Sequence, residues 1–225
     1  MHRRTLRALL LCAAGATTVL GGWAGSAAGR AAGSAATAAG ARSARAALLA
    51  RSALGRSWSV SAPPPRRIPP LTCARFKPHL AGVSGTGAAS SPTYAAGKSG
   101  PFFSQSAYSY ASAAAESSIW HALARPGLLA CIAGSVTGGS QDGVSFAVTA
   151  KRTLRLPRLQ AKAAAYAVSA TATSAEVQTD VYVVSIVLGY GRTISELTVT
   201  SFDQRQARMQ ALRLARIAAG RIHSL

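Results

Sequence analysis

The placement of acidic residues constrains this chain more than any other feature of its sequence. The first carboxylate is Glu116, so the 115 residues before it carry 13 lysines and arginines and no acidic group. Globular surfaces mix charges of both signs, whereas signal segments, transit segments and basic tails lack acidic residues. We therefore expect the first part of the chain to serve targeting and tethering, and a folded domain to follow it.

Residues 1–28 have the layout of a signal peptide. A basic start with Arg3, Arg4 and Arg7 precedes an apolar stretch at 8–20, and small residues at 24–28 offer a cleavage site. The sequence therefore predicts an exported protein, extracellular or associated with the cell envelope. Two alternatives remain open. The uncharged stretch 8–29 is long enough for an uncleaved membrane anchor, and the acid-free, Ser-rich sequence up to residue 56 also suits an organellar transit peptide.

Residues 29–72 are predicted to form a disordered basic tether rich in Ala, Arg and Pro. The proline-rich run 63–70 is typical of extended polyproline II. Residues 41–54 could instead form a basic helix that lies on anionic lipid. The predicted partner of the tether is an anionic cell envelope or membrane surface. Its basic residues include Arg42, Arg45, Arg51, Arg56, Arg66 and Arg67.

Residues 73–225 are predicted to form a single α+β domain. Runs of β-branched and aromatic residues predict an antiparallel sheet of about four to five strands, with helices packed on one face. The predicted strands are residues 102–110, 144–154, 163–173, 177–188 and 193–202.

Three helices are predicted from caps and helical spacing. Ser112 suits the cap of a helix over 113–124, and Pro126 suits the first turn of the next, over 127–133. Asp203 is expected to cap a last helix over 204–222, which should close over the sheet. Its apolar face comprises Ala211, Leu214, Ala215, Ala218 and Ile222.

The cysteines predict one disulfide. Cys12 leaves with the signal peptide, and Cys73 and Cys131 remain as an even pair for an oxidising compartment. The alternative is two free thiols in a reduced protein. A metal site is not expected, because two cysteines 58 residues apart have no histidine pair nearby. No cofactor is predicted.

No recognisable catalytic motif is present, so the chain is predicted not to be an enzyme. Serines are frequent, but none stands in a Gly-x-Ser-x-Gly elbow, and the four histidines are scattered. The six carboxylates are too dispersed for an acid and base pair. We expect Glu196 and Asp180 to offset neighbouring arginines. A secreted enzyme without a recognisable motif remains an alternative.

The net charge of +19 is the electrostatic signature of nucleic-acid binding, but no binding motif accompanies it. Export would also separate the chain from nucleic acid, which makes anionic lipids or cell-wall polymers the better targets. The predicted function is an exported, non-catalytic binding or sensor-like module for an unknown protein or small ligand. A basic protein that binds nucleic acid or another polyanion is the alternative.

Several stretches of residues 73–225 resemble a group of small exported proteins from GC-rich actinobacteria. The resemblance lies in residues 73–78 (CARFKP), 120–131 (WHALARPGLLAC), 154–157 (LRLP), 181–192 and the closing Arg-rich helix. More distantly, the order of elements resembles the extracellular sensor domains of mycobacterial receptor kinases and the PsbP/Mog1-like fold. The resemblance implies an exported α+β domain and names no catalytic residue.

Overall fold

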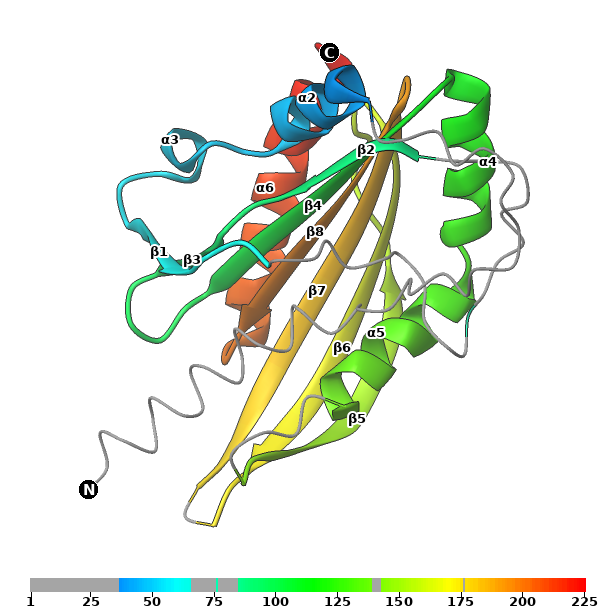
Figure 1. Ribbon diagram of the computed structural model, residues 1–225. Coiled ribbons are helices and arrows are strands. Elements are labelled where there is room, and N and C mark those ends of the chain that lie inside the picture. Colours follow the sequence, from blue (N-terminus) through cyan, green and yellow to red (C-terminus); the bar gives the residue numbers. More distant parts are fainter. Residues whose placement is uncertain (1–36, 66–75, 77–84, 139–142, 176) are drawn as a thin grey trace.

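Helices cover both faces of one antiparallel sheet (Figure 1). The computed structural model describes residues 37–65, 76, 85–138, 143–175 and 177–225. The predicted signal peptide, with Arg3, Arg4 and Arg7, lies outside these residues. The predicted tether residues Arg66 and Arg67, and Cys73, also lie outside them.

The described residues form eight strands in one sheet. Every neighbouring pair is antiparallel. Their order is β1-β3-β4-β8-β7-β6-β5, and β2 also pairs with β4. The strands are β1 (Trp58–Ala62), β2 (Gly85–Ser90), β3 (Thr93–Ala96), β4 (Phe102–Tyr110), β5 (Ser145–Leu154), β6 (Lys162–Thr173), β7 (Gln178–Tyr190) and β8 (Thr193–Ser201).

The five predicted strands are confirmed as β4 to β8, within one or two residues at their ends. The sheet is larger than predicted because β1, β2 and β3 extend it beyond β4. β1 (WSVSA) alternates apolar and polar residues, but it lies within the predicted tether. β2 and β3 are short and rich in Gly, Ala and Ser, as in GTGAAS and TYAA. Such residues have low strand propensity and give no apolar alternation for a sequence pattern to detect.

Five helices lie in the described residues: α2 (Ala38–Ala47), α3 (Arg51–Leu54), α4 (Ala113–Leu123), α5 (Pro126–Gly138) and α6 (Gln204–His223). The three predicted helices correspond to α4, α5 and α6. Both predicted caps are confirmed. The hydroxyl of Ser112 accepts from the Ala115 amide at 3.1 Å, and the Asp203 carboxylate accepts from the Gln206 amide at 2.6 Å.

The prediction that helices pack on one face only is wrong. α2 and α6 cover one face, whereas α4 and α5 cover the other (Figure 1). The reason lies in β7, where both sets of alternate residues are apolar. Ile186 and Leu188 face the core under α2 and α6, and Val183 and Val187 face the core under α4 and α5.

The predicted disordered tether differs from the structure over residues 37–65, which contain α2, α3 and β1. Ala44, Leu49, Leu54 and Trp58 from this segment are buried in the same core as α6. Sequence composition did not indicate this, because most buried side chains of α2 are Ala and Gly, which also dominate flexible linkers. The arginines of the segment lie on its exposed side: Arg42, Arg45, Arg51 and Arg56.

Buried Gln105 of β4 fixes the end of α2 to the sheet. Its side-chain oxygen accepts from the Leu49 amide at 2.7 Å, and its nitrogen donates to the Ala47 carbonyl at 3.0 Å and to the Ser195 hydroxyl at 2.8 Å. A buried amide with all of these partners satisfies backbone groups that would otherwise be costly to bury. Residues 37–65 therefore belong to the folded domain.

Candidate functional site

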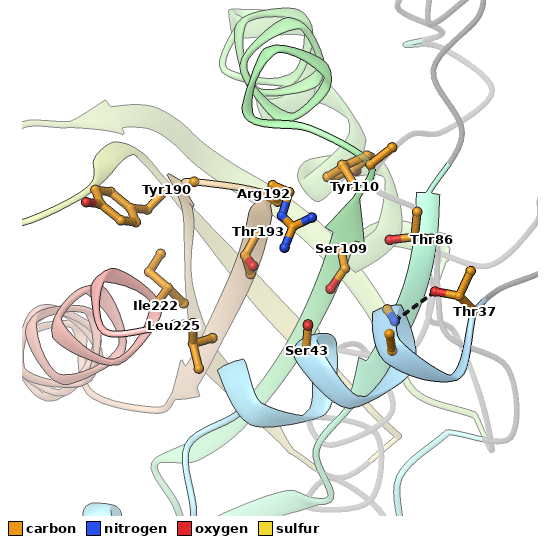
Figure 2. A pocket seen from close by; sticks show the side chains of 14 residues that line it. Thr37, Ser43, Thr86, Ser109, Tyr110, Tyr190, Arg192, Thr193, Ile222 and Leu225 are labelled. Atoms are coloured by element: carbon orange, nitrogen blue, oxygen red, sulfur yellow. Dashed lines mark hydrogen bonds between the residues drawn. The ribbon is translucent and has the colours of Figure 1, made fainter.

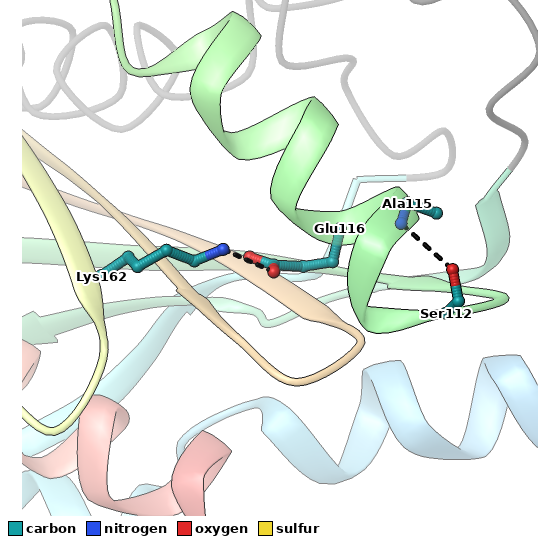
Figure 3. Close-up of polar contacts among 4 residues, drawn as sticks. All are labelled: Ser112, Ala115, Glu116 and Lys162. Atoms are coloured by element: carbon teal, nitrogen blue, oxygen red, sulfur yellow. Dashed lines mark hydrogen bonds and ion pairs between the residues drawn. The ribbon is translucent and has the colours of Figure 1, made fainter.

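An ion pair between buried Glu116 and partly exposed Lys162 ties α4 to the sheet (Figure 3). The Lys162 ammonium on β6 donates to Oε2 of Glu116 at 2.7 Å, and it also lies 5.5 Å from the ring centre of Trp120. Burial raises the pKa of Glu116, and the hydrogen bond and charge of Lys162 act in the opposite direction. The contact holds α4 against β6 and β7, which is a positioning role.

Glu196 of β8 is the second buried carboxylate of the described residues, at 5% exposure. Its Oε1 accepts from the Ser185 hydroxyl at 3.1 Å. Burial raises its pKa to about 7, and the bond from Ser185 opposes this shift. The prediction that Glu196 and Asp180 offset arginines is wrong, because neither carboxylate forms an ion pair with an arginine among the described residues. Asp180 accepts instead from Thr171 and Tyr182.

A cavity of about 400 Å³ opens where the N-terminal half of α2 meets the turn between β7 and β8 (Figure 2). Its walls come from α2, β2, the end of β4, this turn and the end of α6. The lining residues are Thr37, Ala39, Gly40, Ser43, Thr86, Ser109, Tyr110, Ala111, Tyr190, Gly191, Arg192, Thr193, Ile222 and Leu225.

The walls of the cavity are fixed by backbone contacts. The Thr37 amide donates to the Thr86 carbonyl at 2.8 Å, which joins α2 to β2. The Tyr110 amide donates to the Arg192 carbonyl at 2.8 Å, which joins β4 to the β7–β8 turn. Gly191 has a φ of +58° in this turn, a left-handed conformation that Gly adopts without steric cost. The cavity is thus held open by rigid elements.

Among the described residues that line the cavity, Arg192 is the only one with a charged side chain. Its guanidinium has no hydrogen-bond or carboxylate partner among the described residues. Hydroxyl groups surround it, from Ser43 on α2, Ser109 on β4 and Thr193 on β8. Figure 2 shows Arg192, Ser43 and Ser109 turned toward the interior of the cavity. The site therefore combines one positive charge with several neutral hydrogen-bonding groups.

Ser109 is the most informative of these groups. It is 3% exposed, and its hydroxyl has no hydrogen-bond partner among the described residues. A buried polar group without a partner costs about 1 to 3 kcal/mol. Such a group at the wall of a cavity indicates that the cavity holds a partner for it, either water or a ligand.

The first turn of α2 also favours a negatively charged group in the cavity. Thr37, Ala39 and Gly40 line the cavity, and the Thr37 hydroxyl accepts from the Gly40 amide at 2.9 Å. The N-terminal end of a helix carries a partial positive charge. Burial, with a smaller contribution from Glu116, raises the pKa of Tyr110, whose side chain packs in the core under α4 and α5.

The described residues contain no group of three or more His, Cys, Asp or Glu that could hold a metal ion. Among the described residues, His223 lies beside the cavity residue Tyr190, with the two rings tilted and their centres 4.4 Å apart. Within the described part of the chain, no single helix is long and apolar enough to cross a membrane. The bent pair α4 and α5 meets the same criterion of length and composition when taken together.

The residues predicted as sites lie apart from the cavity. Arg42, Arg45, Arg51 and Arg56 are spread over α2, α3 and the following turn, and Arg51 donates to the Trp58 carbonyl at 3.1 Å. Cys131 is buried in α5 and is disulfide-bonded. Its predicted partner Cys73 is outside the described residues, so the Cys73–Cys131 pairing stays a prediction.

The cavity residues were missed because they are distant in sequence. The predicted strands 177–188 and 193–202 imply a short turn that contains Arg192, but nothing in that pattern connects Arg192 with Ser43 or Ser109. The packing of α2 beside β4 brings them together. Only the turn between β7 and β8 could have pointed to the site, because it places one cation, Arg192, where two buried strands end.

No protein-family model matches this chain, and no curated protein is similar to it in sequence. Among solved structures it is similar to the extracellular domain of PknH from Mycobacterium tuberculosis. The two chains share 13% identity with a TM-score of 0.43, and the match covers 82% of this chain and 96% of that one. This is a weak structural resemblance.

Proposed function

We propose that this protein is an exported, non-catalytic binding module whose site is the cavity between α2 and the β7–β8 turn. The observation that carries the proposal is the juxtaposition of Arg192, without a carboxylate partner, and buried Ser109, without a hydrogen-bond partner, on one cavity wall. The volume of about 400 Å³ lies in the range of small-molecule sites.

The ligand class that suits this site is a small anion with several oxygen atoms, such as a carboxylate or a phosphate. A guanidinium binds such groups through paired hydrogen bonds, and hydroxyls complete the coordination of the remaining oxygens. The carboxylates Glu116 and Glu196 do not line the cavity. A cationic ligand would therefore meet Arg192 without compensation.

Export is supported by the signal-peptide layout of residues 1–28. Its test is the intact mass of the protein recovered from the extracellular or envelope fraction. A mass that lacks about 28 residues supports export with cleavage. A full-length species in the cytosol contradicts it. Among the described residues that line the cavity, none is a His, Asp, Glu or Lys that could act as a base for Ser43 or Ser109, and this supports a binding role rather than a catalytic one.

The binding proposal is tested by calorimetric titration with inorganic phosphate and with succinate, with glucose as an uncharged control. We expect at least one anion to bind, and glucose to give no heat of binding. Arg192→Gln should weaken anion binding tenfold or more, because a hydrogen bond to a charged group contributes about 1.5 to 3 kcal/mol. Arg158→Gln, which removes an exposed charge outside the cavity, is the matched control.

Ser109→Ala provides a second, independent readout. Without ligand the variant should be as stable as the wild type or about 1 kcal/mol more stable, because it removes an unsatisfied buried hydroxyl. Its affinity for the anion should nevertheless fall. Binding that is equal in wild type and Arg192→Gln, or no binding of either anion, would overturn the proposed function.

A further inference from the structure

The outer face of α6 carries exposed arginines with apolar side chains between them. Arg205, Arg208 and Arg216 are exposed, Met209 is 52% exposed and Leu212 is half-buried. At 100° per residue these five positions fall on one side of the helix. The opposite side packs on the sheet through Ala211, Leu214 and Ala218. We call the five exposed-side residues the α6 basic face.

Two other arginines of α6 have a structural role, because each donates to a backbone carbonyl of another helix. Arg213 donates to the Leu54 carbonyl at 3.0 Å, and Arg221 donates to the Ala46 carbonyl. Cations stabilise carbonyls at helix C-termini, so these two arginines fasten α2 and α3 to α6. By contrast, Arg205, Arg208 and Arg216 have no hydrogen-bond or carboxylate partner among the described residues.

Positive charge predominates around the α6 basic face. α6 contains five arginines and no acidic residue. Arg152 of edge strand β5 is exposed on the same face of the sheet, because it pairs with Ala167, which packs on the α6 side. Glu196 is buried under the other face. Two carboxylates lie on the α6 side: Asp203 caps the first turn of α6, and exposed Asp180 of β7 accepts from Tyr182, which packs against the α6 core. Uncompensated positive charge of this kind attracts an anionic surface.

The apolar residues Met209 and Leu212 distinguish between two anionic partners, a soluble polyanion and a lipid bilayer. A soluble polyanion is bound by charge and needs no exposed apolar side chain between the arginines. At a membrane interface, apolar side chains enter the acyl boundary while guanidinium groups contact lipid phosphates. We propose that the α6 basic face docks the protein on the surface of an anionic lipid bilayer, with α6 parallel to the membrane.

This inference does not depend on the cavity. Arg192 lies on the β7–β8 turn and is not part of the α6 basic face. The inference also assigns the contact with anionic lipid to the folded domain, whereas the sequence predicted that a basic tether makes this contact. The arginines of α2 and α3 are exposed, but they are not interleaved with exposed large apolar residues.

The test is co-sedimentation of the full chain with vesicles of phosphatidylcholine, with and without phosphatidylglycerol. We expect binding only to vesicles that contain phosphatidylglycerol, with weaker binding as salt is raised. The triple variant Arg205→Gln, Arg208→Gln and Arg216→Gln should bind on the order of a hundredfold more weakly, because each cation near an anionic bilayer contributes about fivefold.

The controls separate local from general effects of charge. A charge-matched variant with Lys98→Gln, Arg125→Gln and Lys151→Gln removes three positive charges outside α6 and should keep most of the binding. Met209→Gln should weaken vesicle binding severalfold without any change in charge. Arg192→Gln should bind vesicles like the wild type, so failure of the cavity proposal and failure of this one are distinguishable.

Two outcomes would overturn the inference. One is equal vesicle binding by the α6 triple variant and the charge-matched control, which would assign the effect to net charge. The other is binding to duplex DNA or to soluble polyphosphate that is as tight as vesicle binding and unchanged by Met209→Gln. That result would identify the face as a polyanion site.

Discussion

At the scale of single residues, Glu196 has the most unusual environment of the described carboxylates. It is 5% exposed on β8, and its one hydrogen bond within the described residues comes from the Ser185 hydroxyl. Burial disfavours the charged form, which raises the pKa to about 7. Glu196 is therefore partly protonated near neutral pH, and its charge is a source of instability.

The sign of the resulting pH dependence follows from linkage. The folded protein holds the Glu196 proton more tightly than the unfolded chain, so the stabilising effect is complete below the unfolded pKa of about 4.3. The free energy of unfolding should then fall as pH rises toward 7. One pKa unit corresponds to about 1.4 kcal/mol, so the total loss is on the order of 3 kcal/mol.

Glu196→Gln should remove this pH dependence, because the amide can still accept from Ser185 but does not ionise. We expect the variant to be more stable than the wild type at pH 8, and to lose this advantage at pH 4. Urea denaturation at both pH values measures the difference. Asp180→Asn is the control, since it removes one negative charge at an exposed position. A stability difference for Glu196→Gln that is the same at both pH values would contradict this account.

Arg192 and Ser109 show why the candidate site could not be predicted from sequence at the residue scale. Each belongs to an element that was predicted correctly, namely the β7–β8 turn and β4. Their approach to each other depends on α2, a helix that sequence composition assigned to a linker. Residue types of a site can be read from sequence only when one element or motif places them together.

At the scale of elements, α2 packs against β2 at very short range. A Cβ added at Gly87 would lie 2.2 Å from the Gly40 carbonyl carbon, and one added at Gly40 would lie 2.3 Å from the Thr86 oxygen. The backbones of helix and strand are thus in direct contact. Any side chain at either position forces α2 away from the sheet.

Gly87→Ala should therefore destabilise the protein by about 2 to 4 kcal/mol, because the clash is with backbone atoms that cannot rotate away. Gly85→Ala in the same strand is the matched control. A Cβ at Gly85 would meet only the Ser109 carbonyl oxygen at 3.6 Å, an ordinary contact. Its effect should stay within about 0.5 kcal/mol. Urea denaturation of both variants measures this, and equal effects would contradict the described packing of α2 on β2.

The elements that sequence predicted well share one property. β4 to β8 and α6 bury large apolar or β-branched residues at the period of their structure, which a sequence pattern detects directly. α2, β2 and β3 pack through Gly, Ala and Ser. Their burial follows from close backbone approach, and no periodicity in hydropathy reveals it.

At the scale of the whole molecule, the sheet separates two apolar cores. One lies under α4 and α5, and the other lies under α2 and α6. The second core takes Leu49, Leu54 and Trp58 from the segment before residue 66. Burial of a large apolar side chain contributes about 1.5 to 3 kcal/mol. These three residues together contribute on the order of 5 kcal/mol, which is comparable to the whole stability of a typical domain.

A chain that begins at residue 73, where the sequence placed the start of the domain, should therefore fail to fold cooperatively. It would expose Phe103, Ala107 and Leu197, and it would leave Gln105 without the Leu49 and Ala47 partners of its buried side chain. We expect a broad urea transition by far-ultraviolet circular dichroism, together with binding of a hydrophobic dye. Circular dichroism is the suitable signal, because the shorter chain also lacks Trp58.

The comparison chain begins at residue 29, where the predicted signal peptide ends, and should unfold in one sharp transition. A third chain, also from residue 29 but with Leu49→Ala and Leu54→Ala, separates lost packing from lost length, because it keeps the backbone bonds to Gln105. We expect it to be destabilised by several kcal/mol and yet to unfold cooperatively. If the chain from residue 73 unfolds as sharply as the chain from residue 29, then the segment only covers a domain that is complete without it. In that case the cavity, whose wall includes α2, would form only when the segment docks.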